Sequence, residues 1–188
     1  MSKVILLEGV DGCGKTTIAH SLINNHNYNY IHLSKLQPEQ NIDEYYDTVI
    51  DIVKLYKKLN YNLVIDRGYI TNLIYCHIFN DPKVISNEHS IELYNLIDLT
   101  IIGLPSYTKY IEDFKKLCET RHELYNDMSH VYKYYKDLWE GESILDNIFA
   151  DEVNAFGGLQ NMTKFILYDR YSVSKDNVDG WINKVLEK

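Results

Sequence analysis

A run of eight residues near the N-terminus could bind a chain of phosphates. Residues 9–16, GVDGCGKT, satisfy the pattern G-x-x-x-x-G-K-[ST], and they follow an apolar run and precede a helical pattern. Glycines let the backbone curl so that N–H groups converge on phosphate oxygens, while the lysine reaches the outer phosphates and the hydroxyl ligates Mg²⁺. With Lys15 as a catalytic residue and Thr16 as a metal ligand, we predict that ATP and Mg²⁺ bind to Gly9, Asp11, Gly12, Cys13, Gly14, Lys15, Thr16 and Thr17.

A carboxylate and an arginine stand together after a later apolar run. Asp66 ends the segment NLVID at residues 62–66, and Arg67 follows it. A carboxylate at the carboxyl end of a strand beside a phosphate loop can orient Mg²⁺ or its waters, and an adjacent arginine can clamp an acceptor phosphate. Both residues are therefore predicted to be catalytic, with Asp66 also at the metal. The alternative is that Arg67 pairs with a nearby carboxylate.

Arginine is scarce in this chain, at positions 67, 121 and 170 only, whereas tyrosine occurs 17 times. Only arginine combines a permanent charge with a planar fork that grips phosphate in two places, so each of the three is a candidate phosphate ligand. For Arg170, which follows the apolar run KFILYD, an ion pair with Asp169 or Asp176 is the favoured interpretation. The abundance of Tyr, Asn, Ile and Lys is also typical of an AT-rich coding genome, such as that of a phage or virus.

The elements that must hold these residues alternate along the chain. Apolar runs predict five strands, at residues 3–8, 28–33, 62–66, 98–104 and 164–169. Apolar residues at helical spacing predict helices that begin at residue 16, at 42–59, at 69–79, around 90–97, in two segments within 107–139, and after Ser174 as a cap. Residues 141–162 receive no assignment. Strands that alternate with helices predict an α/β fold class with a five-stranded parallel sheet and helices on both faces, and the phosphate loop after the first strand makes this a three-layer P-loop NTPase fold.

Length and composition narrow the class of protein. The 188 residues have the size of one domain and contain no linker or repeat, so residues 1–188 are predicted to form a single domain. A formal charge of −8 disfavours broad binding of duplex nucleic acid. Cys13, Cys76 and Cys118 share no close spacing, which argues against a disulfide framework or a zinc knuckle. The first apolar run reaches Glu8 too soon for a signal peptide or a membrane span, so we expect a cytoplasmic protein, in the host cytoplasm if it is viral, with no membrane partner.

Two segments together, LEGVDGCGKTT at residues 7–17 and VIDRGYITNLIY at residues 64–75, resemble the thymidylate kinase family, whose members transfer the γ-phosphoryl group of ATP to dTMP. The resemblance implies a nucleotide kinase that acts on a nucleoside triphosphate and a deoxynucleoside monophosphate and that forms a homodimer. It also implies that Asp11 binds the 3′-hydroxyl of the acceptor and that the rest of the acceptor is held by Arg67, Thr71, Asn72 and Tyr75. For Tyr75, a place in the core is the alternative.

The chain also departs from the family pattern. Where the family usually has an Arg-Glu-Pro motif, only Lys35 and Pro38 could correspond. Lys35 is therefore predicted to bind the acceptor in place of an arginine, and the acceptor could be dTMP or a modified deoxypyrimidine monophosphate. The resemblance also implies a short lid at roughly residues 118–125, in which Arg121 is predicted to be catalytic by stabilising charge on the transferring phosphoryl group. The alternative for Arg121 is an ordinary solvated charge.

Three other functions stay open on the sequence alone. A deoxynucleoside kinase would use Glu8 or Asp66 as a general base on a hydroxyl group. A DNA-directed kinase would phosphorylate a 5′ end or a modified base, and DNA is a partner only in that case. A protein that binds ATP as a regulatory ligand, with a degenerate lid, is the non-enzymatic possibility. In any kinase, Glu8 would either position the waters of Mg²⁺ or accept hydrogen bonds from local backbone.

Overall fold

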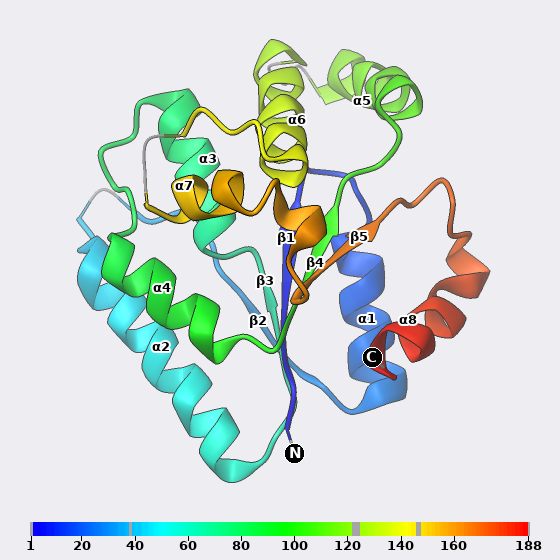
Figure 1. Cartoon of the computed structure of the whole chain (residues 1–188). Coiled ribbons are helices and arrows are strands. Elements are labelled where there is room, and N and C mark those ends of the chain that lie inside the picture. The colour runs from blue at the N-terminus through cyan, green and yellow to red at the C-terminus, as the bar shows by residue number, and fades with distance from the viewer. Residues whose placement is uncertain (1, 38, 122–124, 146–147, 188) are drawn as a thin grey trace.

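The protein is built on one parallel sheet. A computed structural model describes residues 2–37, 39–121, 125–145 and 148–187, without the side chains of residues 117–127. Its five strands lie in the spatial order β2-β3-β1-β4-β5, and every neighbouring pair is parallel (Figure 1). They are β1 (Val4–Gly9), β2 (Asn29–His32), β3 (Leu63–Asp66), β4 (Leu99–Gly103) and β5 (Phe165–Tyr168), which confirms the five predicted strands.

Helices connect the strands and cover the sheet. The α-helices are α1 (Lys15–His26), α2 (Ile42–Leu59), α3 (Tyr69–Phe79), α4 (Asn87–Leu96), α5 (Tyr107–Arg121), α6 (Tyr125–Glu140), α7 (Ile148–Ala155) and α8 (Val178–Leu186). Two short 3-10 helices are η1 (Leu159–Asn161) and η2 (Lys175–Asn177). The predicted helix at 42–59 has the bounds of α2, and the side chain of Asn41 caps it by accepting a hydrogen bond from the N–H of Asp43 at 2.8 Å.

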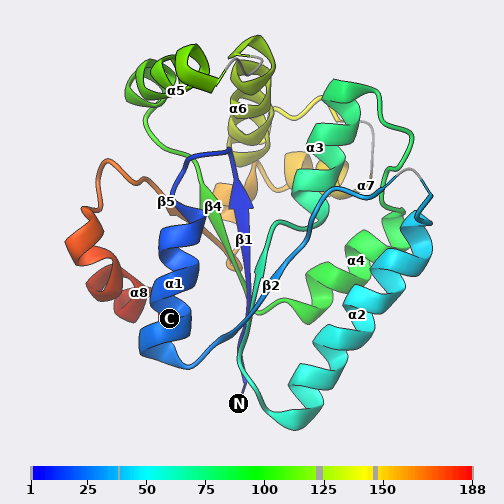
Figure 2. The same ribbon diagram turned by 180° about the vertical axis from the view of Figure 1, so that it is seen from behind.

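The side chains of β1 alternate between two cores, as the period of a strand requires. Val4 and Leu6 belong to a large cluster with residues of α2, α3, α4, α6 and α7, whereas Ile5 and Leu7 belong to a smaller cluster with α1 and α8. Two opposite views show the same division, with α1 and α8 on one side of the sheet and α2 and α4 on the other (Figures 1 and 2). The three-layer α/β fold is thereby confirmed.

The strand register brings the predicted site residues to one edge of the sheet. Leu7 of β1 pairs with Asp66 of β3, and Asp66 pairs with His32 of β2 on the other side. Because parallel strands end at the same edge, the loop after β1 and the Asp66–Arg67 pair become neighbours. Helices α5 and α6 lie beyond this carboxyl edge in both views (Figures 1 and 2).

The structure differs from the sequence-based expectations near the C-terminus. Within residues 141–162, which had no assignment, α7 packs against α4 and α6 and buries Phe149, Ala150 and Val153. Ser174 does not cap the last helix, because the helical turn η2 intervenes and α8 begins at Val178. Among the described residues, no helix is long and apolar enough to cross a membrane.

Candidate functional site

The loop after β1 has the backbone shape of a phosphate cradle. Gly9, Gly12 and Gly14 have φ angles of 121°, 73° and 101°, a range that favours glycine. A Cβ atom on Gly9 would lie 2.2 Å from the carbonyl oxygen of Gly103 in β4, so this strand end also requires the smallest residue. Gly14 precedes α1 without a side-chain cap in the described structure, which leaves the first N–H groups of the helix available for an anion.

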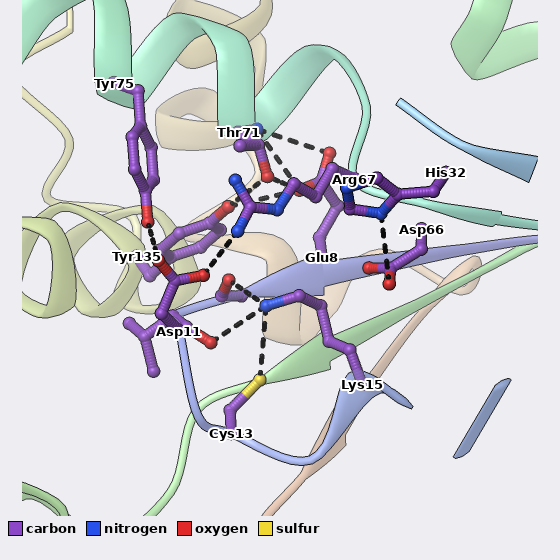
Figure 3. Close-up of polar contacts among 12 residues, drawn as sticks. Glu8, Asp11, Cys13, Lys15, His32, Asp66, Arg67, Thr71, Tyr75 and Tyr135 are labelled. Atoms are coloured by element: carbon purple, nitrogen blue, oxygen red, sulfur yellow. Dashed lines mark hydrogen bonds and ion pairs between the residues drawn. The ribbon is translucent and has the colours of Figure 1, made fainter. Parts of the chain in front are cut away.

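Lys15 extends its ammonium group into this cradle. Nζ donates to the carbonyl oxygens of Gly9 at 2.8 Å and Val10 at 2.9 Å, and it lies 3.7 Å from Sγ of Cys13 (Figure 3). Burial raises the pKa of the Cys13 thiol, so Cys13 packs behind the loop as a neutral group. The ammonium group is thus held among carbonyl oxygens that it can exchange for phosphate oxygens, while Thr16 lies exposed in the first turn of α1.

Glu8, just before the loop, caps helix α3 from the neighbouring strand. Its fully buried carboxylate accepts hydrogen bonds from the N–H groups of Ile70 and Thr71, both at 3.2 Å, from the hydroxyl of Thr71, and from Tyr135 at 3.1 Å. Gly68 cannot cap α3 with a side chain, so Glu8 supplies the oxygen atoms that accept hydrogen bonds from the first N–H groups of the helix. Burial raises the pKa of Glu8, and the hydrogen bonds from Thr71 and Tyr135 oppose the rise. Of the two roles expected for Glu8, the structure shows hydrogen bonding to backbone, but to α3 rather than to the loop.

Asp66 ends β3 as a buried carboxylate with one oxygen engaged. Oδ2 accepts a hydrogen bond from the hydroxyl of Tyr30 at 3.0 Å and lies 3.4 Å from Nδ1 of His32. Burial, followed by the hydrogen bond to Asp66, raises the pKa of Tyr30 to about 12, so this hydroxyl remains a donor at neutral pH. Oδ1 is buried and has no hydrogen-bond partner within the described part of the chain. A buried, unpartnered carboxylate oxygen near a phosphate loop fits a role toward metal-bound water.

Arg67 follows β3 in a left-handed backbone conformation that residues other than glycine rarely adopt. Its φ angle is 71°, and its N–H is held by the carbonyl oxygen of Leu7 at 2.9 Å. The guanidinium group donates to Oδ1 of Asp11 at 2.7 Å, and the hydroxyl of Tyr75 donates to Oδ2 of the same carboxylate at 3.2 Å (Figure 3). Burial is the largest single influence and would lower the pKa of Arg67, but Asp11, followed by Tyr75, Tyr135 and Asp66, together outweigh it, so the pKa is raised. The expected alternative, an ion pair, is present, and its partner is itself a predicted site residue.

A cavity of about 300 Å³ opens beside Arg67. Aromatic rings of α2 and α3 form much of its wall, and Thr71 and Asn72 of α3 reach it as well. A pocket of this size and mixed polarity is typical of a site for a small organic ligand. The lining residues are Leu33, Ser34, Lys35, Leu36, Tyr45, Tyr46, Arg67, Gly68, Thr71, Asn72, Tyr75, Cys76, Phe79, Asp81 and Lys83. We call this space the acceptor cavity, and it contains all the residues predicted to hold the acceptor except Asp11, which contacts two of them.

Two of these residues have contacts that refine their predicted roles. Nδ2 of Asn72 donates to the carbonyl oxygen of Lys83 at 3.1 Å, and Oδ1 accepts from the N–H of Ile85 at 2.8 Å. Both polar ends of the amide therefore brace the segment before α4, so Asn72 shapes the cavity wall in this structure. The side chain of Lys35 is 83% exposed and lies 3.8 Å from the carboxylate of Asp81, at the mouth of the cavity.

Arg170 reaches the phosphate loop from beyond β5. Its guanidinium group donates to the carbonyl oxygen of Gly12 and, at 2.7 Å, to Oδ2 of Asp113 in α5. The favoured interpretation, an ion pair, is confirmed, but the expected partners Asp169 and Asp176 are wrong. A second cavity of about 230 Å³ lies here, lined by Gly12, Tyr110, Asp113, Phe114 and Arg170. We call it the loop-side cavity.

The structure describes the predicted lid, residues 118–125, only in part: residues 122–124 and the side chains of the others lie outside the described part of the chain. The side chain of Arg121 is among them, so the prediction that Arg121 is catalytic stays a prediction. Among the described residues, no group of three His, Cys, Asp or Glu side chains could hold a metal ion.

Several residues of the site were missed by sequence reasoning. Tyr30 and His32 contact Asp66, Tyr135 contacts Glu8, and Tyr110 lines the loop-side cavity. Tyr135 was expected on an apolar helix stripe, which gave no sign of its hydroxyl contact. Only the position of β2 beside β3 could have indicated Tyr30 and His32.

Two comparisons relate the sequence of this chain to known proteins. Residues 5–66 match the AAA family, described as ATPase family associated with various cellular activities. Over 124 residues, covering 62% of this chain and 75% of the other, the chain is 30% identical to a protein of Acidianus bottle-shaped virus (isolate Italy/Pozzuoli) named "Putative thymidylate kinase".

Solved structures share the fold over nearly the whole chain. The YorR protein of Bacillus subtilis, in complex with phosphorylated GDP, has a TM-score of 0.66 at 20% identity and covers 98% of this chain and 96% of its own. Thymidylate kinase from Ehrlichia chaffeensis has a TM-score of 0.56 at 15% identity, with coverage of 100% and 99%, and deoxyadenosine kinase from M. mycoides with bound dATP has 0.54 at 18%, with coverage of 98% and 99%. Together with the phosphate loop and the Asp66–Arg67 pair, the 30% identity to the viral protein shows that the chain belongs to the thymidylate kinase family of nucleotide kinases.

Proposed function

We propose that this protein transfers the γ-phosphoryl group of ATP, with Mg²⁺, to a deoxynucleoside monophosphate, either dTMP or a modified deoxypyrimidine monophosphate. The observation that carries the proposal is the position of Arg67. Its guanidinium group stands at the boundary between the phosphate loop and the acceptor cavity, 2.7 Å from the Asp11 carboxylate. A monophosphate in the cavity could replace part of this ion pair and receive the paired donors of the guanidinium group.

The acceptor side favours a nucleotide over a bare sugar or phosphate. Tyr45, Tyr46, Tyr75 and Phe79 offer aromatic faces and edges against which a base can pack. The Asp11 carboxylate faces Arg67 and Tyr75, so it is available to a hydroxyl group of the acceptor rather than directed at the donor phosphates. Lys35 adds a positive charge at the mouth of the cavity, close to Asp81.

The donor side is proposed to hold ATP through the loop of residues 9–16. Lys15 would neutralise the outer phosphates, and Thr16 and Asp66 would hold Mg²⁺ directly or through water. The metal would neutralise charge that develops on the transferred phosphoryl group. Arg121 is proposed to add a further positive charge from the lid.

A nucleoside acceptor with Glu8 or Asp66 as its general base is less well supported, because such a base would have to reach the acceptor cavity. Glu8 is fully buried and its carboxylate is committed to α3, and neither Glu8 nor Asp66 is among the residues that line the acceptor cavity. A monophosphate needs positioning and charge rather than a strong base, since its phosphate oxygen is already nucleophilic.

An acceptor panel tests the proposed function. Labelled ATP and Mg²⁺ would be offered with deoxynucleosides, deoxynucleoside monophosphates and DNA ends, and label is expected in a pyrimidine deoxynucleoside diphosphate. The Lys15→Ala variant should lose at least about a hundredfold in kcat/KM, because it removes a charge that stabilises the transferring phosphoryl group. Label confined to nucleosides or to DNA would contradict the proposal. A homodimer, as the family implies, is part of the same proposal and would be measured by sedimentation.

A further inference from the structure

Two tyrosine hydroxyl groups in this protein are buried without a hydrogen-bond partner in the described structure, those of Tyr69 and Tyr110. Tyr69 is 0% and Tyr110 is 1% exposed. A buried hydroxyl group that lacks a partner destabilises a fold, so such a group calls for an explanation. The surroundings of the two hydroxyl groups differ, and the difference suggests a role for one of them.

Tyr69 lies in the main core. Its ring packs edge-on against Phe149 of α7 at 5.1 Å, and it lines neither the acceptor cavity nor the loop-side cavity.

Tyr110, in contrast, stands in the first turn of α5 and lines the loop-side cavity beside Gly12 and Arg170. Its ring is held by stacking on Tyr132 at 5.4 Å, and Tyr132 is itself fixed by a hydrogen bond from its hydroxyl to the carbonyl oxygen of Pro105 at 2.8 Å. Stacking therefore holds the ring in place, while its hydroxyl group has no hydrogen-bond partner in the described structure.

The groups that influence the pKa of Tyr110 come from both the phosphate loop and the acceptor side of the site. Burial raises its pKa, Tyr75, Asp11 and Cys13 raise it further, and Arg170 acts in the opposite direction. The hydroxyl group thus keeps its proton and can only gain from an acceptor of hydrogen bonds. Since Asp11 and Tyr75 face the acceptor and Cys13 belongs to the phosphate loop, Tyr110 lies at the junction between donor and acceptor.

We propose that the Tyr110 hydroxyl donates a hydrogen bond to an oxygen of the terminal phosphoryl group of the donor triphosphate. This inference rests on the proposed function for the identity of the donor. The loop-side cavity borders Gly12, where the loop would hold phosphates, and a phosphate oxygen would supply the partner that the buried hydroxyl lacks. Tyr110 would then add a neutral donor from α5, the helix that leads into the predicted lid.

Equilibrium binding to the Tyr110→Phe variant tests the contact without turnover. The variant should bind a non-hydrolysable ATP analogue about tenfold or more weakly than the wild type, because a hydrogen bond to a charged phosphate oxygen is lost. Affinity for ADP, which lacks the terminal phosphoryl group, should stay within about twofold. Without nucleotide, the melting temperature of the variant should equal or exceed that of the wild type, since an unpaired buried hydroxyl is removed.

The Tyr69→Phe variant is the matched control. It also removes a buried hydroxyl without a described partner, but away from the cavities, so its affinity for the ATP analogue should equal that of the wild type. Equal affinity of the wild type and Tyr110→Phe for the analogue would overturn the inference, and so would an equal loss of ADP binding. A wild type that binds the analogue but phosphorylates no monophosphate would contradict the proposed function alone. A wild type that does not bind the analogue would overturn both.

Discussion

Arg67 and Arg170 form ion pairs of the same length in different parts of the molecule. Each arginine side chain is 30% exposed, and each guanidinium group lies 2.7 Å from a carboxylate. Arg67 leaves a central strand with a φ angle of 71° and pairs with Asp11 of the phosphate loop. Arg170 lies on a loop and pairs with Asp113 on α5, whose side chain is 49% exposed.

The comparison shows that the position of an ion pair says more about its role than its distance. Arg67 borders the acceptor cavity, and its backbone is held in a rarely populated conformation that places the guanidinium group there. Arg170 lines the loop-side cavity and connects α5 to the loop, and it shares its donors among Gly12, Asp113 and Tyr171. Both pairs are partly exposed, so neither contributes much free energy to the fold. The difference is in what each guanidinium group can reach: Arg67 borders the acceptor cavity and can act on the acceptor, whereas protein groups already take up donors of Arg170.

Replacement of Arg67 should have the larger effect on catalysis. The Arg67→Ala variant is expected to lose about a hundredfold or more in kcat/KM for the acceptor, because the charge-assisted hydrogen bonds to the acceptor phosphate are removed. Steady-state kinetics at fixed ATP would measure this loss. The Arg67→Lys variant should recover only part of the activity, since an ammonium group lacks the planar fork. A loss of less than about threefold in kcat/KM for the Arg67→Ala variant would contradict the larger role assigned to Arg67.

Replacement of Arg170 should have a smaller effect on the donor side. The Arg170→Ala variant should change kcat/KM by less than about tenfold, mainly through the KM for ATP, because it removes an exposed pair and one contact to the loop. Kinetics with varied ATP and a saturating acceptor would measure it. If Arg170→Ala loses as much as Arg67→Ala, with KM unchanged, then Arg170 contacts the reacting groups and the contrast between the two arginines is wrong.

The smallest expected effect is on the pH dependence of stability, and it concerns Glu8, which caps α3. Burial raises the pKa of Glu8 above its ordinary value of 4.5. The protonated carboxyl is therefore favoured in the folded state, and the contribution of Glu8 to stability is full below pH 4.5 and is lost as the pH rises through the folded-state pKa. The Glu8→Gln variant cannot ionise at this position. The free energy of unfolding of the wild type should therefore fall relative to that of the variant as the pH rises.

Urea unfolding of both proteins at several pH values would test this prediction. The difference in the free energy of unfolding, wild type minus Glu8→Gln, should fall as the pH increases from about 4. A difference that is constant or that grows with pH would show that Glu8 is ionised in the fold as readily as in the unfolded chain.

Much of the framework could be predicted because it depends on local patterns. Buried strands appear as short apolar runs, and α2 has the bounds that its apolar spacing predicted. The spacing of the glycines and Lys15 indicated a phosphate loop, since that motif is contiguous in sequence. The last helix was predicted to begin too early, because the propensity of Ser174 to cap helices did not reveal the separate turn η2.

The site itself could be predicted only in part, because several contacts join distant segments. Glu8 caps α3, 62 residues away from Ile70, and Tyr30 reaches Asp66 across two neighbouring strands. Asn72 was expected to face the acceptor with a free amide, but its donor and acceptor brace residues 83 and 85. A side chain has no fixed partner until the strand order and the helix packing bring other polar groups near it.

By itself, the sequence determined the phosphate loop, the Asp66–Arg67 pair, the five strands and the family, because each depends on residue types at short spacing. Only the tertiary structure decided which carboxylate faces which arginine, that Glu8 supports α3, and that Tyr110, whose hydroxyl is buried without a described partner, lines one cavity with Gly12. The physical reason is that charge pairing and burial depend on distance in space, and parallel strand order brings together residues far apart in the chain.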